Sequence, residues 1–149
     1  MPLETMVEER RSRTSDTINK LLAERQQLLV SFCRVAGLEP YTLDKSLLTL
    51  LREFCQVLVD YVATVHFELY TRIDEGTERR AGVAAVAEQV YPRIAETTEM
   101  AVDFNDKYEV VNQEKLAQSL SEDLSRLGQA FASRFELEDR LFTALVERR

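Results

Sequence analysis

Apolar residues recur every three or four positions through most of this chain, which is the spacing of a helix with one buried side. The clearest case begins near a candidate cap, Thr42 or Asp44, and continues to about Asp74, close to Gly76. No Gly or Pro interrupts its apolar side, which consists of Leu47, Leu51, Phe54, Leu58, Val62, Val65, Leu69 and Ile73. The pattern predicts a long helix whose apolar side faces the core.

A first helix is predicted from a cap at Ser15 or Asp16 to about Ala36, where Gly37 is suited to terminate it. Residues 1–14 are polar and poorly patterned, so we expect a tail or a frayed first turn there. The apolar side of this helix consists of Ile18, Leu21, Leu22, Leu28, Leu29, Phe32, Cys33 and Ala36.

Two further helices are predicted in the second half of the chain. Within residues 77–110, a helix through Ala81–Val90 meets Pro92, which either kinks one helix or separates a short helix from a main one. Their apolar row is Val90, Ile94, Thr97, Ala101, Phe104 and Tyr108. A last helix extends from a cap at Asn112 to about Glu147, with its apolar side at Leu116, Leu120, Leu124, Leu127, Phe131, Phe142 and Leu145.

Few turns and long helices favour an all-α fold. Four glycines and three prolines in 149 residues leave little material for the turns of a β-sandwich or barrel. A 45% hydrophobic composition is enough for one sizeable core. We therefore expect a single domain over residues 1–149, folded as an antiparallel four-helix bundle with a Pro-kinked third helix.

Charged or titratable residues interrupt three of the apolar rows. Arg25 falls in the first row, His66 at the margin of the second, and Arg134 and Glu138 in the last. Because an isolated buried charge is costly, we expect these four residues to form an internal polar layer, with Arg134 and Glu138 as a pair. Such a layer either fixes the register of the helices or lines a small ligand pocket.

The side of the central helix opposite its apolar row has a different character. Gln56, Asp60, Ala63 and Phe67 share this side at about 100° per residue. An exposed aromatic beside a small residue and a carboxylate is typical of an interface. Two interpretations remain open at this point: the row binds a partner, or another helix covers it.

The residue inventory argues against catalysis and metal binding. The chain has one histidine and two cysteines, Cys33 and Cys55, both among apolar residues. A di-iron bundle needs Glu-x-x-His motifs, and the residue three before His66 is Ala63. With no phosphate-binding glycine loop and no nucleophile motif, we expect no enzyme activity, no cofactor and no metal.

The net charge limits the class of partner, and the targeting signals limit the location of the protein. The formal net charge of −7 argues against direct nucleic-acid binding and permits attraction to a basic protein. The charged start of the chain does not resemble a secretory signal, and no apolar run is long enough to span a membrane. We expect a cytoplasmic protein.

Five separated motifs resemble the Rsd/AlgQ family of bacterial sigma-factor regulators. They are ERQQLL at residues 24–29, FCQxLVDY at 54–61, HFxxY at 66–70, YPxI at 91–94 and RFxLEDxL at 134–141. Their order and spacing extend the resemblance over nearly the whole chain.

The resemblance implies a helical bundle that acts as an anti-sigma factor, typically in stationary phase. Such a protein binds region 4 of the housekeeping sigma factor, the domain that reads the −35 promoter element and contacts RNA polymerase. The family's sigma-contacting face corresponds here to Asp60 and Phe67, with Ala63 where the family usually has a serine. The resemblance also implies the phosphocarrier HPr and a stringent-response enzyme as candidates for further partners.

Two other functions remain as alternatives at this point. One is a helical bundle that binds a small ligand or a metal through Arg25, His66, Arg134 and Glu138. The other is a homo-oligomer in which the Phe67 side is self-complementary.

Overall fold

The computed structural model describes residues 3–37, 46–70, 81–110 and 113–146. Within these ranges it contains the α-helices α1 (Leu3–Val35), α2 (Leu47–Val65), α4 (Ala81–Glu109) and α5 (Gln113–Val146). A π-helical turn, η1 (His66–Tyr70), continues α2. The predicted all-α bundle of long helices is confirmed.

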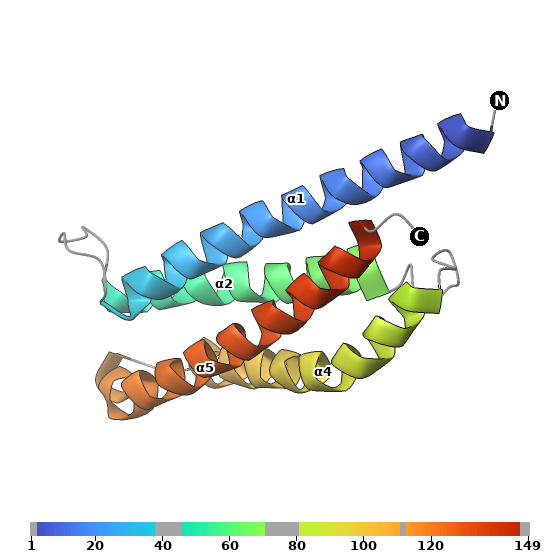
Figure 1. The fold of residues 1–149 in the computed structure, drawn as a ribbon. Coiled ribbons are helices and arrows are strands. Elements are labelled where there is room, and N and C mark those ends of the chain that lie inside the picture. Colours follow the sequence, from blue (N-terminus) through green and yellow to red (C-terminus); the bar gives the residue numbers. More distant parts are fainter. Residues whose placement is uncertain (1–2, 38–45, 71–80, 111–112, 147–149) are drawn as a thin grey trace.

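The helices pack in a ring in which each contacts the next. α1 packs against α2, α2 against α4, and α4 against α5, while α1 and α5 also touch. Each helix begins near the end of the bundle where the preceding one finishes (Figure 1). The amino-terminal turns of α1 extend past the other helices in the same view.

The start of α1 differs from the sequence prediction. The helix begins at Leu3. The prediction of a tail or frayed turn before residue 15 is therefore wrong, and so is the prediction of a helix cap at Ser15 or Asp16. Glu and Arg are abundant in this segment and are good helix formers. The buried Thr14 also lies in it, so local propensity and packing both favour helix there.

The start of α2 is set by Ser46, whose side-chain oxygen accepts a hydrogen bond from the backbone N–H of Thr49 at 3.2 Å. Such a bond satisfies one of the free donors of a helix start. Thr42 and Asp44, the predicted caps, lie outside the described residues. They are not the cap of α2, because the helix begins at Leu47 directly after Ser46. Leu47, which the sequence places on the apolar side of this helix, is 40% exposed.

The later predicted boundaries are closer to the structure. Pro92 lies inside the single helix α4, so a separate short helix before it is wrong, while a kink at Pro92 stays a prediction. The last helix ends at Val146, one residue before the predicted end. The predicted end of α2 near Asp74 and the predicted cap Asn112 lie outside the described residues.

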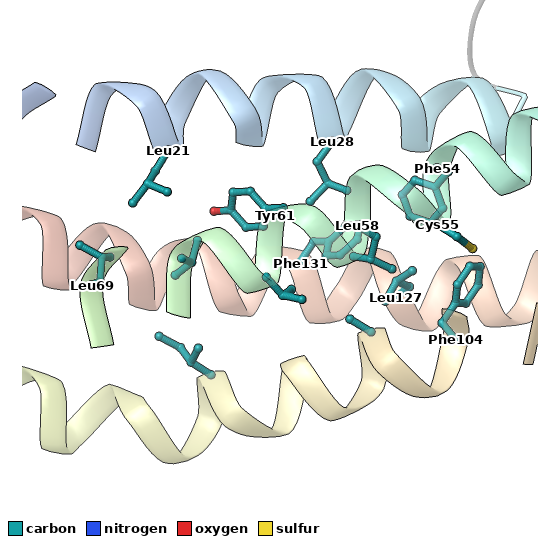
Figure 2. Close-up of a cluster of buried hydrophobic side chains, with 14 of the residues drawn as sticks. Leu21, Leu28, Phe54, Cys55, Leu58, Tyr61, Leu69, Phe104, Leu127 and Phe131 are labelled. Atoms are coloured by element: carbon teal, nitrogen blue, oxygen red, sulfur yellow. The ribbon is translucent and has the colours of Figure 1, made fainter. Parts of the chain in front are cut away.

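Phe54 occupies the centre of the core. Its ring contacts those of Phe32 on α1, Phe104 on α4 and Phe131 on α5, with centroids 5.8, 5.8 and 6.3 Å away. Figure 2 shows Phe54, Phe104 and Phe131 within the buried cluster. One aromatic residue of α2 thus contacts all three other helices and fixes the depth at which α2 sits.

Candidate functional site: the outer row of α2 and the internal polar layer

The four residues of the outer row lie together on the solvent side of α2 and its π-helical extension. Gln56 donates a hydrogen bond to Oδ1 of Asp60 at 3.0 Å, and both side chains are exposed. Ala63 is half-buried, and Phe67 is 71% exposed. The interpretation that another helix covers this row is wrong, because Gln56, Asp60 and Phe67 remain open to solvent.

The π-helical turn gives the end of this row its geometry. A π turn holds one more residue than an α turn and is frequent at functional sites. It begins at His66, so Phe67 lies in its first residues. The ring of His66 meets that of Phe67 edge-on, with centroids 5.4 Å apart.

His66 does not belong to the internal polar layer, and that prediction is wrong. The side chain is exposed and lies beside Phe67. It follows the buried Val65 by one residue, a rotation of about 100° around the helix, which turns it away from the core. The sequence places His66 at the margin of the apolar row, and that position alone does not show whether the side chain faces the core or solvent.

Glu138 is the centre of the polar layer and is 0% exposed. Its Oε2 accepts a hydrogen bond from Nε of Arg134 at 2.8 Å. Its Oε1 accepts bonds from Nη2 of Arg25 at 3.0 Å and from the hydroxyl of Tyr61 at 2.5 Å. The structure thus brings Arg25, Arg134 and Glu138 together, with Tyr61 in place of His66.

Two arginines connect Glu138 to the other helices. Nη1 of Arg134 donates to the hydroxyls of Thr98 at 2.7 Å and Thr97 at 3.2 Å, which joins α5 to α4. Nη1 of Arg25 donates to Oδ1 of Asp139 at 2.8 Å, which joins α1 to α5. The Arg25 guanidinium also lies 4.6 Å from the ring centroid of Phe135, a cation–π contact.

The electrostatics of the layer keep Arg25 charged and Tyr61 protonated. Burial raises the pKa of Tyr61 above its usual range, and the neighbouring Glu138 raises it further. Burial works to lower the pKa of Arg25, but bonds to Tyr61 and Asp139 and the charge of Glu138 outweigh it and raise that pKa. The polar groups of the layer therefore satisfy one another, which favours a role in fixing helix register.

Sequence reasoning missed four members of this layer: Tyr61, Thr97, Thr98 and Asp139. Tyr61 lies three residues after Leu58 and four before Val65, so it belongs to the apolar row, and a buried tyrosine hydroxyl needs a partner. That signal could have found it. Thr97 was predicted as part of the core, where it is buried, but its hydroxyl had no evident role from sequence.

Metal ligands and membrane spans are not found in the part of the chain that the structure describes. Within it, no group of three His, Cys, Asp or Glu side chains is placed to hold a metal ion. None of its helices has the length and apolar character needed to cross a bilayer.

The comparison with known proteins covers nearly the whole chain. Residues 3–146 match the family model described as "Regulator of RNA polymerase sigma(70) subunit, Rsd/AlgQ". The chain belongs to the Rsd/AlgQ family. The motifs at residues 24–29, 54–61 and 134–141 carry Arg25, Tyr61, Arg134 and Glu138, so three of the family-like motifs meet in the polar layer.

Individual Rsd/AlgQ relatives are similar over most of their length. "Regulator of sigma D" of Yersinia enterocolitica is 32% identical over 138 residues, which covers 90% of this chain and 83% of that relative. The protein of the same name from Yersinia pseudotuberculosis is 31% identical, covering 90% and 82%. That from Enterobacter sp. strain 638 is 31% identical over 145 residues, covering 93% and 86%. No solved structure matches the chain.

Proposed function

We propose that this chain is an anti-sigma regulator that binds region 4 of the housekeeping sigma factor through the outer row of α2. Bound there, it keeps region 4 from RNA polymerase and from the −35 promoter element. The observation that carries the proposal is the exposed row itself, in which Asp60 and the 71% exposed Phe67 flank Ala63. The family and the names of its members support a sigma factor as the partner.

The chemistry of the row fits a basic helical partner. Phe67 offers a large apolar area, which is the kind of side chain that dominates binding energy at interfaces. A domain that reads DNA presents basic residues to the phosphates, and such a surface is attracted to Asp60 and to a chain of net charge −7. The partner surface that this chain would cover is then the one that otherwise contacts the promoter.

The outer row has Ala63 at the position where the resemblance leads one to expect a serine. Without a hydroxyl, this position supplies no side-chain hydrogen bond to a partner. A methyl group between Asp60 and Phe67 instead allows close approach of a partner helix. Binding then depends on the apolar contact of Phe67 and the charge of Asp60.

The test is a titration of the purified chain with a fragment that carries sigma region 4. We expect Phe67→Ala and Asp60→Ala each to weaken binding by roughly tenfold or more, because each removes a central interface group. Leu22→Ala and Asp16→Ala, at exposed positions on α1, are the matched controls and should change binding by less than about threefold. Helix content should stay unchanged in all four variants. Unchanged affinity in both α2 variants would remove the proposed face.

A functional readout separates sequestration from simple binding. In a transcription assay with purified polymerase, the chain should inhibit a promoter that depends on its −35 element, and excess region 4 should relieve the inhibition. Light scattering of the free chain tests the homo-oligomer alternative. A dimer that Phe67→Ala converts to a monomer would favour self-association over sigma binding.

A further inference from the structure

A cleft of about 290 Å³ opens between α2 and α4 beside the outer row. From α2 it is lined by Arg52, Gln56 and Val59, and from α4 by Asn105 and Glu109, with the buried Cys55 also in its wall. Gln56 belongs both to this cleft and to the outer row, where it bonds Asp60. The cleft is therefore continuous with the face assigned to the sigma partner.

The cleft has an apolar side. Val59 is half-buried in its wall. Val102 is 42% exposed and lies three residues before Asn105 and seven before Glu109, so all three share one side of α4. On that shared side, Val102 lies about one helical turn from Asn105 and presents apolar surface to solvent.

The α4 rim of the cleft is negative. Glu109 is the last residue of α4, where the unpaired carbonyl groups of the helix end add partial negative charge. The negative charge of Glu109 also acts on the wall of the cleft. Burial raises the pKa of the Cys55 thiol to about 11, and the charge of Glu109 adds to that rise. A cation is favoured at this rim, while Arg52 on the α2 side is suited to an acidic or polar group.

We propose that this cleft receives an apolar side chain of the same sigma partner that packs on Asp60 and Phe67, with a Lys or Arg of that partner against Glu109. This inference rests on the proposed function and adds a second contact region to it. The row from Gln56 to Phe67 is about 16 Å long, so a helix of roughly three turns spans it and reaches the cleft. The partner segment is thus an amphipathic helix with an aliphatic or aromatic residue near a basic one.

The first test follows methyl groups of the wild-type chain by NMR while unlabelled sigma region 4 fragment is added. Ala63 reports on the outer row, Val59 on the cleft, and Val102 on the exposed side of α4 that also carries Asn105 and Glu109. We expect signals from all three residues to shift or broaden with the same midpoint. Changes at Ala63 without changes at Val59 and Val102 would overturn the cleft proposal and leave the proposed function standing. No binding at all would overturn both.

The second test changes the cleft. Asn105→Trp fills it, and Glu109→Lys reverses the charge of its rim; each should weaken binding by about tenfold or more, with circular dichroism and thermal melting showing an intact fold. Glu99→Lys makes the same charge change at an exposed position on α4 that does not line the cleft, and should cost less than about threefold. Equal losses in Glu109→Lys and Glu99→Lys would mean general charge attraction and would overturn the local contact.

Discussion

The hydroxyl of Tyr61 donates a hydrogen bond to Oε1 of Glu138, with 2.5 Å between the oxygens and 77 positions between the residues in sequence. Tyr61 is 1% exposed and directly follows Asp60, the exposed carboxylate of the outer row. The bond joins α2 to α5 from the inner side of α2. The rotation of α2 that presents Asp60 and Phe67 to solvent is thus the rotation that brings Tyr61 to Glu138.

Tyr61→Phe should lower the free energy of unfolding by roughly 1.5–3 kcal/mol, the usual cost of losing a hydrogen bond to a charged group. The ring still fills its site, so the loss reports on the hydroxyl alone. Tyr108→Phe is the matched control, because the Tyr108 hydroxyl donates to Asp123, whose side chain is 16% exposed and retains access to water. Urea unfolding of both variants checks the prediction, and an equal or larger cost at Tyr108 would contradict it.

Glu138→Gln should destabilise the fold by about 3–5 kcal/mol, since it leaves Arg25 and Arg134 without their buried negative partner. The amide keeps the shape of the side chain but directs an NH₂ group toward donors. Glu136→Gln, two residues away and exposed, should change stability by less than about 0.5 kcal/mol. Denaturant midpoints of the two variants give the comparison. A small effect at both positions would show that the layer contributes little to stability.

Asp123 makes stability depend on pH in the acid range. Burial works to raise the pKa of this carboxyl, but hydrogen bonds from Lys107 at 2.6 Å and Tyr108 at 2.5 Å outweigh it and hold the pKa below its ordinary value. A lowered pKa in the folded state contributes stability that is fully present above the unfolded value of about 3.9 and is lost as the pH falls through the folded value.

Asp123→Asn should therefore destabilise the protein at pH 7, by roughly 1–2 kcal/mol, and by progressively less as the pH falls below about 4. Thermal or urea unfolding of wild type and variant across pH 2.5–7 measures the difference. Asp106→Asn, at an exposed position on α4, controls for the loss of one negative charge. A gap between wild type and Asp123→Asn that widens on acidification would contradict the assignment.

The regular parts of the fold could be read from the sequence because burial follows helical spacing. In α4, every residue of the predicted row from Val90 to Tyr108 is buried, including Thr97. Helix ends were less predictable. Ser46 competes with Thr42 and Asp44 as a cap, and all three residue types are suitable, so the choice depends on where the chain enters the bundle.

The polar layer shows where helical spacing stops being informative. Arg134 and Glu138 lie on one helix, so their i, i+4 spacing alone predicted that they would meet. The partners from other helices depend on rotation and depth, which a single sequence does not give. His66 and Tyr61 illustrate this, because each directly precedes or follows a residue of the apolar row of α2, but His66 faces solvent and Tyr61 faces Glu138.

Gly128→Ala tests how closely α1 and α5 approach. A Cβ at Gly128 would lie 3.2 Å from Cζ of Phe32, closer than ordinary contact, and Phe32 packs edge-on against Phe54 and Phe131. Alanine normally stabilises a helix interior by up to about 1 kcal/mol over glycine. Because the ring of Phe32 would have to shift against the rings of Phe54 and Phe131, we expect the clash to cancel this gain or to make Gly128→Ala destabilising.

The control is Gly82→Ala, in the first turn of α4, where an added Cβ has no neighbour within 4 Å. This substitution should stabilise the protein, by up to about 0.5 kcal/mol near a helix end, chiefly because it restricts the unfolded chain. Combining Gly128→Ala with Phe32→Leu removes the contacting ring atom and should cost less than the sum of the two single changes. Additive effects in that cycle would mean that the residues do not touch, and a stabilising Gly128→Ala would mean that α1 gives way at this crossing.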